Sequence, residues 1–209
     1  MGERSEAILD AFSALAARYG LSRTTLKDVA REAGVSVGTI YNDYADKGAL
    51  IFAFWQRVVG KCIRQMEVFT AQELPPEELL RQLILGHIRW HNEQLQSNRG
   101  VYELMMESSI SYIGKKVFGQ RQIIQRELTG RVEKILRDGA LAGVFEVRGD
   151  FSETALRFVE AFTEYTAPPL VLAREPEDVL KDASSMFSFV VRAVKKDKGT
   201  AATQGAGEE

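Results

Sequence analysis

The chain has 209 residues, of which 45% are hydrophobic and 27% are charged, and its formal net charge is −2. This composition is typical of a globular protein and excludes a largely disordered chain. The slight negative charge argues against a surface that coats nucleic acid without selection. Any DNA binding must therefore come from basic groups gathered on one face.

A single cysteine, Cys62, excludes an intramolecular disulfide and a CxxC metal site. Its place in an apolar run indicates a buried, reduced thiol, which fits a cytoplasmic setting. The N-terminal residues MGERSEAILDAF carry charge from the third residue onward, so no secretory segment is expected. No later stretch reaches the ~18 apolar residues of a membrane span. We therefore expect a soluble, cytoplasmic protein with no membrane partner.

The first predicted helix has apolar side chains at helical spacing, and these are Ile8, Leu9, Phe12, Leu15, Ala16 and Tyr19. Ser5 is available to cap its start, and Gly20 is a typical stop signal. Thr25 and Asp28 then stand three residues apart, which is the spacing of a capping box. They predict a short helix over 25–33.

Another short helix is predicted over 37–43, with Ser36 as its N-cap and Ile40 facing inward. Asp46 can cap a longer helix that runs from Lys47 to about residue 72. This helix is long enough to connect two bodies rigidly.

Further helices are predicted at 76–96, 101–108, 113–139, 152–165 and 177–195. Apart from a possible extended segment at 144–147, no strand is expected. The predicted fold class is all-α, with a three-helix N-terminal helix-turn-helix domain and a larger helical domain.

The helical pattern also suggests where the domains divide. We expect a DNA-binding domain at 1–48 and a ligand-binding and dimerisation domain at 49–196. Residues 197–209 contain no large apolar side chain and cannot offset the entropy of ordering, so a flexible tail is expected there.

Residues 24–47, TTLKDVAREAGVSVGTIYNDYADK, carry the motif on which the functional prediction depends. Two short capped helices joined by a tight glycine turn make a helix-turn-helix, whose second helix can enter the major groove of DNA. Ala30 and Ala33 let the two helices approach closely. Gly34 supplies the positive φ of the turn, and Gly38 removes bulk where the backbone must come near the duplex.

Within this motif, Ser36, Val37, Thr39 and Asn42 are predicted to face base edges or phosphates. Asn42 can contact adenine, and Val37 can contact a thymine methyl group. Tyr41 and Lys47 would hold phosphates, and the first N–H groups of the helix at Lys47 and Gly48 favour an anion. The predicted DNA-binding set is Thr25, Lys27, Ser36, Val37, Gly38, Thr39, Tyr41, Asn42, Tyr44 and Lys47.

Between Ile8 and Lys47, the segments ILDAFSALAARYG, TTLKDVAREAGVS and GTIYNDYADK resemble the N-terminal domain of TetR (tetracycline repressor) family transcriptional regulators. The resemblance implies an all-α fold of nine or so helices and a homodimer formed by the last two long helices. It also implies a cavity in the C-terminal domain, whose small-molecule occupant separates the two DNA-reading heads.

Two residues depart from the family pattern. Asp43 stands where members usually have His or Tyr, and Tyr44 stands where they have Phe. Since a phosphate-facing group is expected at position 43, Asp43 is left out of the DNA-binding set.

His87 and His91 lie four residues apart on one helical face, a spacing that can bind a metal. The residues between them lack the glutamate of an HExxH motif and no third ligand is evident, so neither a metal nor a cofactor is predicted. The two histidines are expected to line an apolar pocket or to satisfy hydrogen bonds in the core. The predicted ligand-binding set is Trp55, His87, Trp90, His91, Tyr102, Met105, Met106 and Tyr112, and ordinary core filling is an equal alternative for each.

The last two predicted helices are strongly amphipathic. Their shared apolar face could be internal packing, but two long amphipathic helices at the end of a chain favour a four-helix dimer interface. The predicted interface residues are Phe158, Phe162, Phe187, Val190 and Val194.

No GxSxG, GxxxxGK[ST] or strand-linked GxGxxG motif is present, and we therefore expect no enzyme. The predicted function is a ligand-responsive transcriptional regulator, a repressor, that binds a palindromic DNA operator as a homodimer. A small apolar or aromatic effector would release it. The alternative is a helical adaptor that binds proteins through its last helices without sequence-specific DNA binding. A helical enzyme with dispersed catalytic residues would instead turn over a substrate and ignore duplex DNA.

Overall fold

The computed structural model of the chain describes residues 2–99 and 112–196, and of 112–118 it describes the backbone alone. Helices make up most of these residues, and in chain order the elements are α1 (Glu3–Tyr19), α2 (Leu26–Glu32), α3 (Val37–Asp43), α4 (Lys47–Thr70), α5 (Pro76–Ser97), α7 (Tyr112–Leu141), α8 (Phe151–Glu160), the 3-10 turn η1 (Thr163–Thr166), α9 (Pro168–Leu172), α10 (Pro176–Val190) and the 3-10 turn η2 (Val191–Ala193). The described residues form no strand, only an isolated bridge between Phe145 and Lys195. The predicted all-α class is confirmed.

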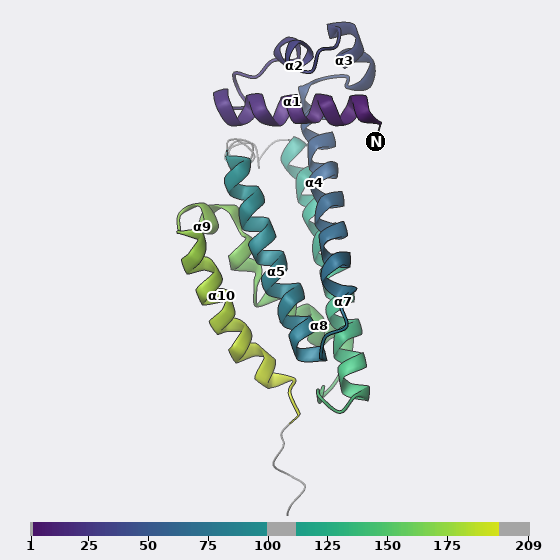
Figure 1. Cartoon of the computed structure of the whole chain (residues 1–209), viewed down its shortest axis with the longest axis vertical. Helices are drawn as coiled ribbons and strands as arrows, with labels where there is room; N and C mark the ends of the chain where they lie inside the picture. The colour runs from purple at the N-terminus through teal and green to yellow at the C-terminus, as the bar shows by residue number, and fades with distance from the viewer. Residues whose placement is uncertain (1, 100–111, 197–209) are drawn as a thin grey trace, which may run out of the picture.

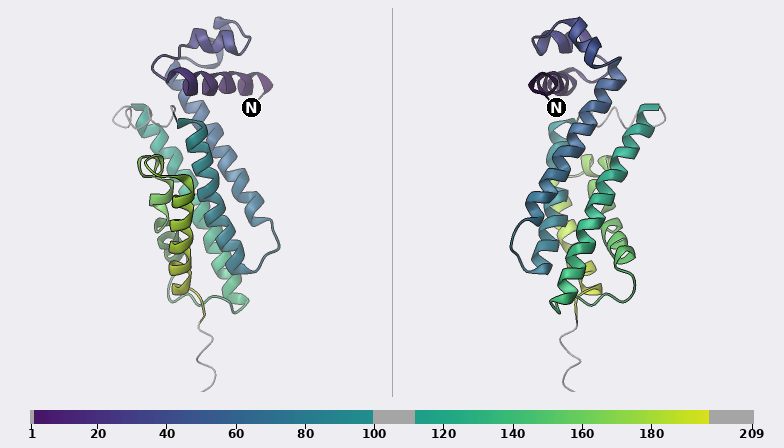
Figure 2. Two further views of the ribbon diagram at one scale, coloured as in Figure 1. Left: turned by 60° about the vertical axis from the view of Figure 1, so that its left-hand side comes forward. Right: turned by 90° about the vertical axis from the view of Figure 1, so that its right-hand side faces the viewer.

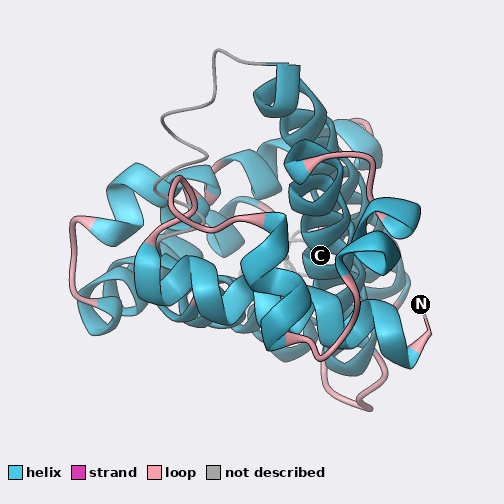
Figure 3. Cartoon of the chain, turned by 90° about the horizontal axis from the view of Figure 1, so that it is seen from above, coloured by secondary structure: helices cyan, strands magenta, loops and turns pink. Residues whose placement is uncertain are grey.

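The helices form a small head at one end of a longer body (Figure 1). The head consists of α1, α2 and α3, with α1 lying across the end of the body. α4 begins at the head and continues along the body, where it packs against α5 and α7, and α7 packs against α8. α10 packs on the other side of α5 (Figure 2). Seen from above, loops join α1 through α5 in turn, and further loops join α7 to the helices that follow it (Figure 3).

Side-chain caps set the bounds of the two short helices of the head. The hydroxyl of Thr25 accepts a hydrogen bond from the backbone N–H of Asp28, and the carboxylate of Asp28 accepts one from the N–H of Thr25, both at 3.2 Å. This is the predicted capping box. Ser36 caps α3 by accepting from the N–H of Thr39 at 3.0 Å. Gly34, between the two helices, has a φ of +67°, as the turn requires.

One apolar core extends from the head into the body. Ile40 is the buried side chain of α3, and it joins residues of α1 and α4 in that core. The rings of Phe12 on α1 and Phe54 on α4 meet edge to face, with their centroids 5.7 Å apart. Aromatic pairs of this geometry add about 0.5–1.5 kcal/mol beyond their buried area. The start of α4 is therefore packed firmly against the head.

Some element bounds differ from the prediction. α1 begins at Glu3 with Gly2 as its N-cap, so Ser5 lies inside the helix. The helix predicted at 152–165 ends at Glu160, where a turn leads into η1. The predicted helix at 101–108 and the predicted tail at 197–209 lie outside the described residues. Within the described ranges, no helix combines the length and apolarity that crossing a membrane requires.

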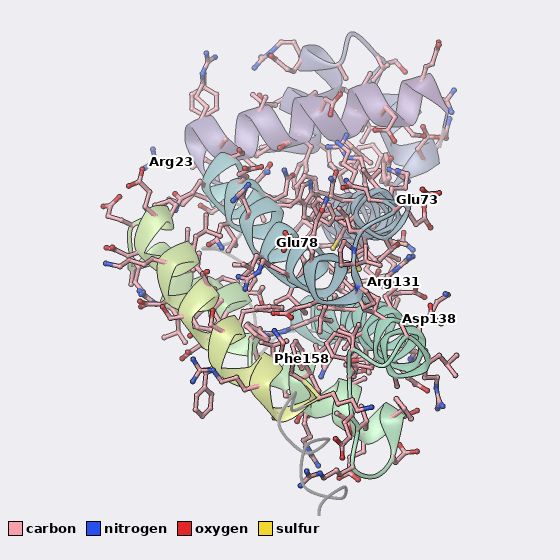
Figure 4. The ribbon with its side chains drawn as sticks, turned by 60° about the horizontal axis from the view of Figure 1, so that its bottom comes forward. Arg23, Glu73, Glu78, Arg131, Asp138 and Phe158 are labelled. Carbon is pink, nitrogen blue, oxygen red and sulfur yellow. The ribbon has the colours of Figure 1, made fainter. Side chains whose placement is uncertain are left out.

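Four of the five predicted dimer-interface residues must be corrected. Phe158, Phe162, Phe187 and Val194 are each at most 4% exposed, because they belong to the apolar core of the single chain. The ring of Phe158 lies 5.7 Å from that of Phe162 and 6.0 Å from that of Phe187, and it points into the interior of the body (Figure 4). These four side chains form part of the core of one chain, not a surface for a second copy. Val190 is half-buried against the core, and its place in a dimer interface stays a prediction.

Candidate DNA-binding interface and effector site

The outer side of α3 carries a strip of four exposed residues, Val37, Gly38, Tyr41 and Asn42. Residues four apart on a helix are neighbours, so Val37 lies beside Tyr41 and Gly38 beside Asn42. Tyr41 is 54% exposed and Val37 is 36% exposed, although both could have packed inward. We call these four residues the α3 strip.

The fold does not require a glycine at position 38. A Cβ built there would meet only the hydroxyl of Ser36, at an ordinary 3.7 Å, and the backbone has helical rather than left-handed geometry. Glycine inside a helix is less stable than alanine by about 0.5–1 kcal/mol. A stability cost without a structural need favours a functional reason, namely the close approach of another molecule to this backbone.

The hydroxyl-bearing residues predicted to bind DNA are engaged within the head. Thr25 donates to the carboxylate of Asp28 at 2.6 Å, and these hydrogen bonds hold the pKa of Asp28 below its ordinary value. The hydroxyls of Ser36 and Thr39 lie 2.8 Å apart. Thr25, Ser36 and Thr39 therefore position α2 and α3, and their hydroxyl oxygens keep spare lone pairs for a partner. Lys27, also in the predicted set, is exposed on α2.

Two residues of the predicted DNA-binding set make contacts inside the protein. Tyr44 is 8% exposed and belongs to the core of the head, where burial raises its pKa. The ammonium of Lys47 donates to the backbone carbonyl of Leu21 and lies 3.5 Å from that of Ser22. Burial also lowers the pKa of Lys47. Tyr44 is thus a core residue, and Lys47 ties the start of α4 to the connection between α1 and α2.

Asp43, which departs from the family pattern, is held by an arginine that the sequence analysis missed. Arg4, at the start of α1, places Nε 3.1 Å from Oδ2 of Asp43 and Nη2 3.0 Å from Oδ1. The two residues are 39 positions apart, and no local pattern connects them.

Arg57 and Ser13 make further polar contacts between the head and the body, and the sequence analysis missed them. Nη1 of Arg57, on α4, lies 2.6 Å from Oδ1 of Asp10 and 3.2 Å from Oε2 of Glu6, both on α1. Ser13 on α1 donates to Oδ1 of Asn98, the residue that ends α5, at 2.6 Å. The available signal was an arginine in the apolar run of α4, because a charged side chain is seldom buried without a partner.

In the body, His87 and His91 lie on α5 with their rings stacked 6.1 Å apart, as their spacing predicts. Burial lowers the pKa of His87 to about 3 and that of His91 to about 4, so both rings are neutral at pH 7. Sγ of Cys62, on α4, lies 3.6 Å from Nδ1 of His87. Burial raises the pKa of the Cys62 thiol to about 12. His91 makes a 2.9 Å hydrogen bond through Nε2 with the carbonyl of Thr166.

Asn92 is a buried polar residue that the sequence analysis did not single out. Its Nδ2 donates to the carbonyl of Ile88 at 2.8 Å and lies 3.4 Å from that of Tyr165. Its Oδ1 is buried and has no hydrogen-bond partner among the described residues. An unsatisfied buried acceptor costs about 1–3 kcal/mol, so this oxygen is suited to a ligand or water that donates a hydrogen bond.

The rest of the predicted ligand-binding set is only partly described. Trp55 on α4 is 6% exposed, and Trp90 on α5 packs partly buried against the core. Tyr102, Met105 and Met106 lie outside the described residues, and of Tyr112 only its place at the start of α7 is described. Across the described ranges, no group of three or more His, Cys, Asp or Glu side chains could hold a metal ion.

Comparison with known proteins identifies the head. Residues 8–54, which span α1 to the first part of α4, match the family described as bacterial regulatory proteins, tetR family. This N-terminal part of the chain, α1 to the first part of α4, is therefore similar to the DNA-binding part of TetR-family regulators. Members of that family are DNA-binding regulators, and the helix-turn-helix predicted from the sequence is the part of this chain that carries the match.

One curated protein resembles part of the sequence, and several solved structures resemble the fold. An uncharacterised HTH-type transcriptional regulator of Bacillus subtilis, YerO, is 29% identical over 86 residues, which cover 40% of this chain and 30% of YerO. The chain thus matches about a third of the length of that regulator. SmeT, the repressor of a Stenotrophomonas maltophilia multidrug efflux pump, superposes with a TM-score of 0.66 at 24% identity, covering 93% of this chain and 91% of SmeT. It has also been solved with triclosan, with a TM-score of 0.67 at 23% identity and 94% coverage of both chains.

A transcriptional regulator of Cytophaga hutchinsonii superposes with a TM-score of 0.76 at 18% identity, covering 91% of this chain and 98% of that regulator. At these low identities the superpositions show a shared fold. The TetR-like arrangement of an N-terminal helix-turn-helix domain and a larger helical domain is therefore confirmed.

Proposed function

We propose that this chain is a TetR-family, ligand-responsive repressor that binds a palindromic DNA operator as a homodimer in the cytoplasm. The observation that carries the proposal is the α3 strip. It combines an exposed aromatic side chain, an exposed amide and a glycine that the fold does not need, on the second helix of a helix-turn-helix. Such a helix fits the major groove of DNA.

Within the strip, Val37 and Asn42 read base edges, because an amide can bond adenine at two points and a methyl group can contact thymine. Tyr41 holds a phosphate, which fixes register without reading sequence. Lys47 acts indirectly, by holding the connection between α1 and α2 that positions α2 against the duplex.

A palindromic operator requires a two-fold symmetric protein. Since the apolar face shared by α8 and α10 is consumed inside one chain, the partner must meet the outer side of these helices. There Phe189 of α10 is 73% exposed, which is exceptional for a phenylalanine. We place Phe189 in the contact between two copies. The division at residue 48 assigns DNA reading to the head and dimerisation and ligand binding to 49–196.

We place the effector site in the body, around His87 and Asn92 of α5. Both side chains are buried and neutral at pH 7. Buried neutral side chains favour an apolar or aromatic effector, and Oδ1 of Asn92 suits a hydrogen-bond donor on it. The complex of SmeT with triclosan supports an effector of this class.

Release from DNA follows as a shift between two populations. In one, the heads match two half-sites about 34–36 Å apart, and in the other they do not. The effector favours the second population because it binds the body more tightly in that arrangement, and the contacts of Arg57 and Ser13 carry the change to α1. Effector and DNA must then weaken each other's binding to the same degree.

Selection of bound duplexes from a random DNA library, followed by affinity measurement on the selected duplex, tests the function. We expect a palindromic consensus. Asn42→Ala should change the preferred sequence, whereas Tyr41→Ala should weaken binding to all duplexes alike. Tyr19→Ala is the matched control, because Tyr19 is a tyrosine of similar exposure, 53%, on α1. Failure of the wild-type protein to enrich any duplex would refute the proposal and favour the protein-binding adaptor.

A further inference from the structure

The ion pair between Arg4 and Asp43 fixes the end of α3 to the start of α1. Both guanidinium nitrogens that face the carboxylate are engaged, Nε at 3.1 Å and Nη2 at 3.0 Å, which is the two-point geometry that arginine makes best. The side chain of Asp43 is 21% exposed and that of Arg4 is 62% exposed. The carboxylate is thus covered mainly on the side that Arg4 occupies.

The position of Asp43 is unfavourable for an acidic residue in two ways. It is the last residue of α3, where a negative charge opposes the helix dipole. It also directly follows Tyr41 and Asn42 of the α3 strip, on a helix proposed to approach a polyanion. A carboxylate there would repel phosphates unless a cation neutralised it.

The helix that carries this carboxylate is also weakly held. α3 has seven residues, and Ile40 is its only buried side chain. A helix this short is not stable by itself and depends on tertiary contacts. The contact with Arg4 is therefore one of few that fix the direction of the α3 C-terminus.

We propose that Arg4 is a positioning residue for DNA binding, which neutralises Asp43 and orients the end of α3 without itself contacting a phosphate. The inference rests on the proposed function, because it concerns the same DNA-reading surface. When the ion pair is intact, its two charges cancel, so it neither attracts nor repels the DNA phosphates. Loss of Arg4 alone then leaves an uncompensated carboxylate beside the duplex, and loss of both charges restores the balance.

The test is a double-mutant cycle of Arg4→Ala, Asp43→Asn and the combined variant, with Kd for the selected duplex measured at several salt concentrations. We expect Arg4→Ala to weaken binding about tenfold, and the combined variant to bind within about twofold of the wild type. The slope of log Kd against log salt should also return to the wild-type value in the combined variant. Thermal unfolding should differ little among the variants, because the pair is exposed.

A matched control exists in the body. Arg137 on α7 contacts Glu133 through Nε at 2.9 Å and Nη2 at 2.7 Å, with side-chain exposures of 51% and 24%. Arg137→Ala should leave DNA affinity unchanged.

The alternatives give different patterns. If Arg4 held a phosphate itself, the combined variant would bind as weakly as Arg4→Ala, and the salt slope would fall by about 0.9 in both. If the ion pair had no effect on DNA binding, Arg4→Ala would bind the duplex like the wild type. Either result overturns this inference while leaving DNA binding by the wild-type protein intact. A wild-type protein that binds no duplex refutes the proposed function, and this inference with it.

Discussion

Arg57 and Asp10 are 47 positions apart in the sequence, yet their charged groups lie 2.6 Å apart across the junction between head and body. The arginine side chain is only 5% exposed, whereas the carboxylate of Asp10 is 71% exposed. The guanidinium also lies over the ring of Phe54, 5.5 Å from its centroid. The buried member of this pair is therefore the cation, and its environment depends on two partly exposed carboxylates of α1.

Arg57 and its acidic partners should respond differently to substitution. Arg57→Met keeps most of the buried stem and frees two carboxylates that water can reach, so we expect a loss of about 1–2 kcal/mol in the free energy of unfolding. Glu6→Gln with Asp10→Asn leaves a buried cation with only neutral acceptors and should cost about 2–4 kcal/mol. Urea denaturation at one fixed protein concentration measures both, since association would shift the midpoint. A larger loss for Arg57→Met than for the acidic double variant would contradict this account.

Gly38 should separate stability from DNA binding. Gly38→Ala adds a methyl group that the fold accommodates, so we expect the free energy of unfolding to rise by about 0.5–1 kcal/mol. Affinity for the selected duplex should fall about tenfold, because the methyl group would hold the α3 backbone off the groove.

The matched control is Gly34→Ala, where φ is +67° and an L side chain is strained. This substitution should lower the free energy of unfolding by about 1–2 kcal/mol. If Gly38→Ala bound DNA as tightly as the wild type, the α3 backbone would not approach the duplex closely.

Local signals explain why the two short helices of the head, α2 and α3, could be predicted closely. Thr25 with Asp28, Ser36 and Gly34 each act within four positions of the chain, so their capping and turn roles are visible in the sequence. The bounds of α3 followed directly from them. The resemblance of the same residues to the TetR family then supplied the functional prediction.

The errors share one physical cause, which is that a pattern shows the apolar side of a helix but not what covers it. Phe158 and Phe187 were predicted to meet a second copy, but they meet each other. Tyr44 was predicted to face DNA, but it is buried in the head. The Arg4–Asp43 and Arg57–Asp10 pairs join residues about 40 or more positions apart, and no local pattern identifies the partner of either arginine.

His87 should make stability depend on pH. Its pKa is about 3 in the folded chain and about 6.5 in the unfolded chain, so between these values the unfolded state binds a proton that the folded state does not. The part of the free energy of unfolding that depends on His87 is therefore full above pH ~7. It falls as pH drops below ~6.5, by at most ~1.4 kcal/mol per pH unit. Urea midpoints between pH 5 and 7.5 measure it. His87→Gln should reduce the slope in this window, and an unchanged slope would show that the ring is already protonated in the folded chain.

Cys62 should be inert toward thiol reagents in the native protein. The thiol is buried beside His87, and its raised pKa of about 12 leaves almost no thiolate at pH 8. We expect iodoacetamide to modify the native protein at least about a hundredfold more slowly than the protein unfolded in guanidinium, as followed by mass spectrometry. Comparable rates would mean that α4 and α5 separate readily in solution.

Phe189 should control association. Phe189→Lys places a charge where the second copy is proposed to pack, so we expect sedimentation to change from a dimer to a monomer at micromolar concentration. Leu141→Lys is the control, because Leu141 is 90% exposed at the end of α7 and should not affect association. A dimer that tolerates Phe189→Lys would place the interface elsewhere.

Hydroxyl-radical footprinting of the selected duplex in complex with the wild-type protein tests the central claim most directly. If two copies of the α3 strip enter consecutive major grooves, two symmetric protected patches should appear about one helical turn, ~34–36 Å, apart. Asn42→Ala should weaken both patches together. Uniform protection that is independent of sequence, or no protection at all, would contradict the claim that α3 reads DNA.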